Sequence, residues 1–145
     1  MRRVFIIRKD LHLTSGKLAA MVSHCAESYW LNLIRKGMIK TDHNYSVKFD
    51  LDNSIVDGYI NDIITKTICE ARNLNQLDKA KVVADELGLV EGVDYGYIDD
   101  ACKTELTPEF TDANGQGRCR VGMWFKPLND EDAHKISKKF PLYKD

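Results

Sequence analysis

The chain has 145 residues, of which 43% are hydrophobic and 30% are charged, and its formal net charge is −1. This length and composition are typical of one soluble globular domain with a sizeable core. The nearly neutral charge excludes a global basic field, so any contact with nucleic acid has to come from a local patch. A candidate patch lies near the N-terminus, although a solvated surface beside a strand explains the same residues equally well. Its members are Arg2, Arg3, Arg8, Lys9 and Lys17.

The cysteines and the short apolar runs limit the cellular setting. None of the four cysteines forms a CxxC pair, which argues against a structural zinc site and favours reduced thiols, two or more of them buried. The run Val4–Ile7 is too short for a signal peptide or a membrane span. We therefore expect a cytoplasmic protein with a single domain over residues 1–145, and a possible insertion around residues 37–64.

The N-terminal third predicts a strand followed by a long helix. Val4–Arg8 is a short apolar run typical of a buried strand. Ser15 is predicted to cap a helix that begins near Gly16 and ends near Lys36, before the stop signal Gly37. The predicted inward face of this helix consists of Leu18, Val22, Cys25, Ala26, Tyr29, Leu33 and Ile34. A second stripe, also spaced by three or four residues, holds Lys17, Met21, His24 and Ser28.

The remaining sequence continues to alternate between strand and helix patterns. Further strands are predicted at residues 66–71, 93–98 and 119–125, and residues 45–49 fit either a strand or a loop. Further helices are predicted at residues 54–64, at 75–87, and from Asn129 or Asp130 to before Pro141. The Asn114-Gly115 turn is of the hairpin type, so the strand after it is expected to be antiparallel to its neighbour. This order predicts an α/β fold with a mixed sheet and helices on both faces.

Chemically useful groups follow two of the predicted strands. Lys17 begins the long helix, and Asp100 and Thr104 lie in the loop after strand 93–98. Ligands of open α/β sheets bind outside the carboxyl ends of strands, so Lys17 and Asp100 can meet in one site. There the lysine would receive a phosphate or an oxyanion, and the carboxylate would orient or deprotonate water. The alternative is a solvent-facing lysine and ordinary turn chemistry.

Other catalytic patterns are weaker. Gly16-Lys17 fails as a phosphate-binding P-loop, because Leu11 stands at the first glycine position and Leu18 replaces the serine or threonine. His24 lies on the Lys17 stripe, but a lone helical histidine is more often a core or supporting residue than a base. No metal-ligand cluster has the required spacing.

Two motifs together resemble those of the archaeal/eukaryotic-type (second-class) peptidyl-tRNA hydrolases. The segment from Arg8 to His24 is similar to the family pattern R-x-D-L-x-x-x-x-G-K-x-A-A-Q-x-x-H, and the segment from Asp100 to Pro108 is similar to D-A-G-x-T-x-x-x-P-G. The resemblance covers most of the chain apart from roughly residues 37–64. It implies a small three-layer α/β domain with a four-stranded mixed sheet, and hydrolysis of the ester between a peptide and the 3′ ribose of tRNA.

The resemblance also implies roles for individual residues. Lys17, Asp100 and Thr104 would be catalytic: Lys17 holds a tRNA phosphate or the ester oxyanion, Asp100 positions a water, and Thr104 fixes Asp100 or the ribose. The implied substrate-binding residues are Arg8, Met21, His24 and Lys103. The implied partner is tRNA, bound through a local basic patch by a monomer or homodimer, with no membrane contact and with neither a metal nor another cofactor.

Three residues depart from the family patterns. Met21 replaces a glutamine, Cys102 replaces a glycine that permits a tight loop, and Glu109 replaces the glycine after Pro108. We expect Glu109 to bring negative charge close to an anionic substrate. These departures leave two alternatives: a catalytically weakened or inactive binding or regulatory protein on the same fold, or a hydrolase or transferase acting on a smaller nucleotide or acyl ester.

Overall fold

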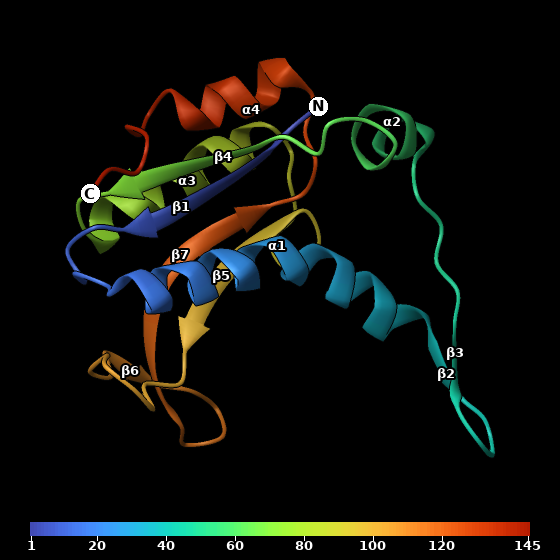
Figure 1. The fold of residues 1–145 in the computed structure, drawn as a ribbon, viewed down its shortest axis with the longest axis horizontal. Coiled ribbons are helices and arrows are strands. Elements are labelled where there is room, and N and C mark those ends of the chain that lie inside the picture. The colour runs from blue at the N-terminus through green and yellow to red at the C-terminus, as the bar shows by residue number, and fades with distance from the viewer.

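The computed structural model describes residues 1–145 and shows a mixed sheet between two helical layers (Figure 1). The main strands follow one another in space in the order β4-β1-β7-β5, and the short β6 pairs with β7. Their bounds are Arg3–Arg8 for β1, Lys66–Ala71 for β4, Tyr95–Asp100 for β5, Phe110–Thr111 for β6 and Gly117–Phe125 for β7. The predicted three-layer α/β fold is confirmed, and β6 adds a fifth strand to the four that were expected.

The pairing directions place three strand ends at one edge of the sheet. β1 runs parallel to β4, and β7 runs antiparallel to both β1 and β5. The predicted antiparallel strand after the Asn114-Gly115 turn is thereby confirmed. β1, β4 and β5 therefore share one direction, and their carboxyl ends lie at the same edge, where α/β proteins bind ligands.

Alternate residues of β1 build the two halves of the core. Phe5 and Ile7 pack toward α1 (Ser15–Gly37), which covers one face of the sheet. Val4 and Ile6 pack toward α3 (Leu74–Glu86) and α4 (Asp130–Ser137) on the other face. Figure 1 shows these two helical layers, with α1 on its own side of the sheet. Since a strand buried on both faces needs apolar side chains at every position, the run at the N-terminus marks β1 as the centre of the fold.

Several element boundaries differ from the predictions for local reasons. Thr14, rather than Ser15, caps α1, because its side chain accepts the backbone N–H of Lys17. β5 begins two residues later than expected, because Asp94 lies in a turn where its carboxylate accepts the N–H of Val90. Asn129, one of the two predicted candidates, caps α4.

The segment between α1 and β4 forms a peripheral unit. β2 (Met38–Lys40) and β3 (Tyr45–Val47) make a hairpin that does not join the main sheet and projects from the end of α1 (Figure 1). The helix predicted for residues 54–64 is shorter: α2 (Asn53–Ile55) continues into the π-helical turn η1 (Val56–Ile60). Ile64 cannot extend it, because its φ of 55° is left-handed. Ile55 and Tyr59 are buried and anchor the segment to the domain.

The cysteines follow the prediction of reduced thiols with at least two of them buried. All four are free, and Cys25, Cys69 and Cys119 are buried. None of the helices combines the length and the apolarity that crossing a membrane requires.

Candidate functional site

Lys17 and Asp100 form an ion pair at the shared carboxyl edge of the sheet. Lys17 lies in the first turn of α1, directly after β1, and Asp100 is the last residue of β5. Lys17 Nζ lies 2.9 Å from Asp100 Oδ1, and the two side chains are only 13% and 11% exposed. The expected meeting of these residues, which are 83 positions apart in the sequence, is therefore present in the structure.

The surroundings of Asp100 favour its ionised form. Its Oδ2 accepts the backbone N–H of Cys102 at 2.9 Å. Burial acts to raise the pKa of Asp100, but the hydrogen bonds from Lys17 and Cys102 outweigh it and hold the pKa below its ordinary value. Cys102 reaches this position with a φ of 59°, in the left-handed region, which explains why the family pattern has a glycine there.

Glu105 fastens the loop after β5 to the start of α1. Its carboxylate accepts hydrogen bonds from the hydroxyl of Thr14 at 2.7 Å and from the Thr14 backbone N–H at 3.1 Å. These bonds lower the pKa of Glu105. The sequence carries no local signal for this contact, because Glu105 and Thr14 are 91 positions apart. The loop is thus held close to Lys17.

Thr104 and Lys103 lie in this fastened loop, and both are exposed. No hydrogen bond joins Thr104 to Asp100, whose carboxylate oxygens bond Lys17 Nζ and the Cys102 N–H. Of the two roles expected for Thr104, contact with a bound ribose is the one compatible with this arrangement.

The stripe of α1 that contains Lys17 faces β5, but its members differ in exposure. His24 is exposed and close enough to Asp100 for its charge to lower the pKa of that carboxyl. Met21 is 1% exposed and packs in the core with Ile98 and Trp124. The expectation that Met21 contacts substrate therefore needs correction: it supports the site from below, where a glutamine would bury its amide in an apolar cluster.

Arg8 belongs to a buried ion-pair network. Its guanidinium bonds both carboxylate oxygens of Glu109, at 2.7 and 2.9 Å, both oxygens of Asp10, and the carbonyl of Arg120 at 2.8 Å. With a side chain only 5% exposed, Arg8 offers no surface to a substrate. Glu109 pairs with the same guanidinium, but one positive charge shared by two carboxylates leaves this group with a net charge of −1, so the expectation that Glu109 repels an anionic substrate stays a prediction.

The Arg8 network leads to a stability prediction for Glu109→Gly. The substitution removes two charge-assisted hydrogen bonds but leaves Asp10 on Arg8, so we expect a loss of about 1–3 kcal/mol in the free energy of unfolding. Denaturant unfolding measures this loss, and tRNA binding at low salt serves as a second readout. Unchanged stability together with tighter tRNA binding would show that Glu109 acts by repelling the substrate and not by holding Arg8.

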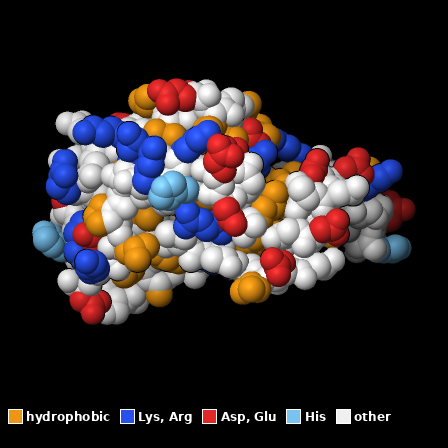
Figure 2. Space-filling model, turned by 90° about the horizontal axis from the view of Figure 1, so that it is seen from above, with side chains coloured by type: hydrophobic (Ala, Val, Ile, Leu, Met, Phe, Trp, Pro, Cys, Tyr) orange, Lys and Arg blue, Asp and Glu red, His pale blue; other side chains and the backbone are white.

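The proposed N-terminal basic patch does not form. Arg3 is fully buried and donates to the backbone carbonyls of Phe125, Ala26 and Cys25, and burial lowers its pKa to about 10. Arg8 and Lys17 are held by carboxylates. Figure 2 instead shows Lys and Arg side chains gathered toward the left of the α4 side. Exposed Lys138 and Lys139, with Lys135, line a cavity of about 210 Å³ beside the C-terminal end of α3.

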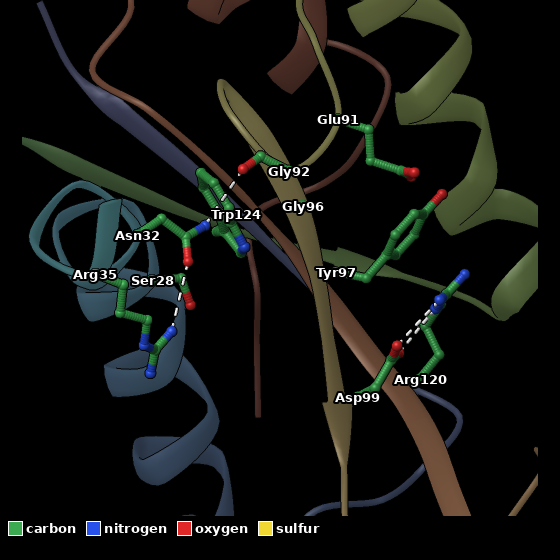
Figure 3. A pocket seen from close by; sticks show the side chains of 10 residues that line it. All are labelled: Ser28, Asn32, Arg35, Glu91, Gly92, Gly96, Tyr97, Asp99, Arg120 and Trp124. Atoms are coloured by element: carbon green, nitrogen blue, oxygen red, sulfur yellow. Dashed lines mark hydrogen bonds and ion pairs between the residues drawn. The ribbon is translucent and has the colours of Figure 1, made fainter. Parts of the chain in front are cut away.

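A larger cavity of about 460 Å³ lies beside the ion pair rather than on it. It extends along α1 and β5, across β5 to the far side of that strand (Figure 3). Its lining consists of Ser28, Asn32, Arg35, Glu91, Gly92, Gly96, Tyr97, Asp99, Arg120 and Trp124. Ser28 and Arg35 continue the helical stripe of Lys17 and His24, so the cavity and the ion pair follow one line along the helix.

No three His, Cys, Asp or Glu side chains come together in a group that could hold a metal ion. The groups that the structure brings to this site are an ammonium group, an ionised carboxylate and a loop hydroxyl.

Comparison with protein-family models gives a match over nearly the whole chain. The model described as peptidyl-tRNA hydrolase PTH2 matches residues 1–143. The matched region includes the Lys17–Asp100 pair, the loop after β5 and the peripheral segment between α1 and β4.

Proposed function

The chain belongs to the peptidyl-tRNA hydrolase PTH2 family, and on this premise we propose that it hydrolyses the ester bond of peptidyl-tRNA. The products would be a peptide and free tRNA. The observation that carries the proposal is the largely buried ion pair between Lys17 and Asp100 at the carboxyl edge of the sheet. It combines a positive group for developing negative charge with a carboxylate that can hold water.

Lys17 serves as the electrophilic group. Its ammonium has three N–H donors, and Asp100 uses one of them, so two remain for the ester carbonyl oxygen or a neighbouring phosphate. When water adds to the ester carbon, negative charge develops on that oxygen. A lysine already held in place stabilises this charge without reorganising.

Asp100 positions the attacking water. Its lowered pKa keeps it ionised at neutral pH, so it accepts a hydrogen bond from water rather than donating one. Collapse of the tetrahedral intermediate breaks the bond to the 3′ ribose oxygen, which takes up the proton lost by the attacking water and leaves as a hydroxyl group. Thr104 would contact the ribose, and Lys103 and His24 would bind the flanking substrate groups.

We assign the tRNA contact to the basic surface of Lys138 and Lys139. Both residues are exposed and lie just before Pro141, whose carbonyl accepts the N–H of Glu70 near the carboxyl end of β4. The chain thus passes from this surface, which lies beside the C-terminal end of α3, to the carboxyl edge of the sheet within a few residues. The surface supplies the local positive charge that the neutral composition requires.

Reversing these charges is expected to weaken tRNA binding. The double substitution Lys138→Glu and Lys139→Glu should lower tRNA affinity and reduce the slope of log affinity against log salt by about two. The matched control reverses Lys40 and Lys48, which lie in or beside the projecting hairpin. Binding titrations over a range of salt concentrations give both slopes, and equal losses in the two variants would reject the assignment.

The proposed activity is tested by release of the N-blocked amino acid from N-acetyl-aminoacyl-tRNA at neutral pH. We expect turnover at physiological ionic strength. We expect the same rate after EDTA treatment, because the proposed groups need no metal. Loss of activity with EDTA and recovery with zinc or magnesium would show a metal requirement. Tight tRNA binding with no turnover would favour the alternative of a binding protein. Hydrolysis of small acyl esters alone would favour the alternative of a hydrolase that acts on smaller esters.

A further inference from the structure

We infer that the open edge of β5 binds the peptide part of the substrate as an added parallel strand, with its C-terminal ester at the Lys17–Asp100 pair. This inference rests on the proposed function and identifies which part of the substrate occupies the 460 Å³ cavity. Four observations support it: the unpaired outer edge of β5, a parallel bridge already formed at that edge, the direction of β5, and the residues that line the cavity.

The outer edge of β5 offers unused backbone groups. β5 is the last strand in the sheet order, with β7 on its other side. The N–H of Lys126 donates to the carbonyl of Asp94, and in an antiparallel ladder the bonded residues alternate. Tyr97 therefore belongs to the set whose N–H and C=O point away from β7. Such an edge is a template for an extended peptide.

A short segment of the chain itself already pairs with the start of this outer edge. Glu91 forms a parallel bridge with Tyr95, and the N–H of Gly92 donates to the carbonyl of Tyr95 at 2.7 Å. This contact covers only the start of the outer edge. A bound peptide running in the same direction as Glu91 and Gly92 would continue the pairing at Tyr97.

The direction of β5 selects the parallel orientation. A peptide parallel to β5 has its C-terminus beside Asp100, and in peptidyl-tRNA the C-terminal carbonyl is the one esterified to the ribose. An antiparallel peptide would place its amino end there instead. The distance along the strand from Tyr97 to Asp100 is about 10 Å at the usual rise per residue. A peptide of about four residues is therefore needed to reach Tyr97.

The cavity suits a peptide of no fixed sequence. Figure 3 shows Trp124, Asn32 and Arg35 on one side of β5, and Tyr97 and Arg120 on the other. Alternate side chains of an added strand would fall on these two sides. The lining is mostly polar and carries both charge signs, so it forms no selective apolar pocket. Recognition through the peptide backbone fits a hydrolase whose substrates differ in the sequence of the peptide.

The test compares kcat/KM for N-acetyl-aminoacyl-tRNA with kcat/KM for an N-acetyl-tetrapeptidyl-tRNA ending in the same residue. We expect the longer substrate to be favoured about tenfold in the wild-type protein, the factor that two backbone hydrogen bonds supply. Tyr97→Pro removes the outward N–H, one of the two bonds, and should lower this ratio about threefold. Tyr97→Val keeps the N–H and serves as the matched control, which should retain the ratio.

A second measurement changes the substrate instead of the protein. N-methylation of the tetrapeptide, one amide at a time, should lower the ratio about threefold at the amide that pairs with the Tyr97 carbonyl and less at its neighbours. Equal kcat/KM for the short and long substrates, or the same ratio in Tyr97→Pro as in Tyr97→Val with no sensitive amide, would overturn the inference and leave the proposed function intact. Absence of hydrolysis with both substrates would overturn the proposed function, and this inference with it.

Discussion

Lys17→Ala and Asp100→Ala should each lower kcat/KM for N-acetyl-aminoacyl-tRNA about 100-fold or more. The loss of Lys17 removes the preformed positive group from the ester oxygen, and the loss of Asp100 removes the acceptor that orients water. Removal of one such electrostatic or acid–base group typically costs about two to three orders of magnitude in rate. Lys17 lies in the first turn of α1 and Asp100 is the last residue of β5, so both lie at the edge of the core and the fold should survive either change.

The measurement is steady-state release of the acyl group, with circular dichroism as the check on folding. Lys40→Ala, on the projecting hairpin, is the matched lysine control and should keep wild-type kcat/KM. Wild-type turnover in both Lys17→Ala and Asp100→Ala would reject the catalytic assignment. A loss in the Lys40 control as large as that in Lys17→Ala would point to a general effect of charge.

Gly122→Ala is expected to give the largest loss of stability. Gly122 lies in β7 opposite Ile7 of β1 and Ile98 of β5, at the centre of the sheet. A Cβ at this position would lie 2.3 Å from the backbone carbonyl oxygen of Ile6, and a carbonyl inside a ladder cannot move aside without breaking its pairing. We expect a loss of about 3 kcal/mol or more in the free energy of unfolding.

Equilibrium denaturation by urea measures this loss. Gly16→Ala is the matched control, because a Cβ at Gly16 would meet nothing within 4 Å and alanine favours the helical conformation there. It should leave the stability unchanged or raise it slightly. A Gly122→Ala protein as stable as Gly16→Ala would show that β1 and β7 can separate at little cost.

The sequence predicts the elements whose signals are local. β4 was predicted with its observed bounds, and the apolar run of β1 differs from the observed strand by one residue. Lys17 and Asp100 were identified because each follows a strand, and the rule that carboxyl ends carry ligands does not depend on detailed packing.

The corrected assignments depend on contacts between distant segments. Helical spacing groups Met21 with Lys17, but only the packing of α1 on Ile98 and Trp124 shows that Met21 is buried. The charge of Glu109 is visible in the sequence, whereas its pairing with Arg8 depends on the pairing of β6 with β7, which holds Glu109 near the end of β1. The later start of β5 has a local cause instead, a turn in which the Asp94 side chain bonds to the backbone of Val90 four residues earlier.

The central claim is that Lys17 and Asp100 act as one unit on the ester, and a double-mutant cycle tests it most directly. Release from N-acetyl-aminoacyl-tRNA is measured for wild type, Lys17→Ala, Asp100→Ala and the double variant. Groups that work as a unit are strongly non-additive, so the double variant should be about as slow as either single variant. Additive losses, with the double variant slower by the product of the two single factors, would contradict a shared catalytic role for the pair.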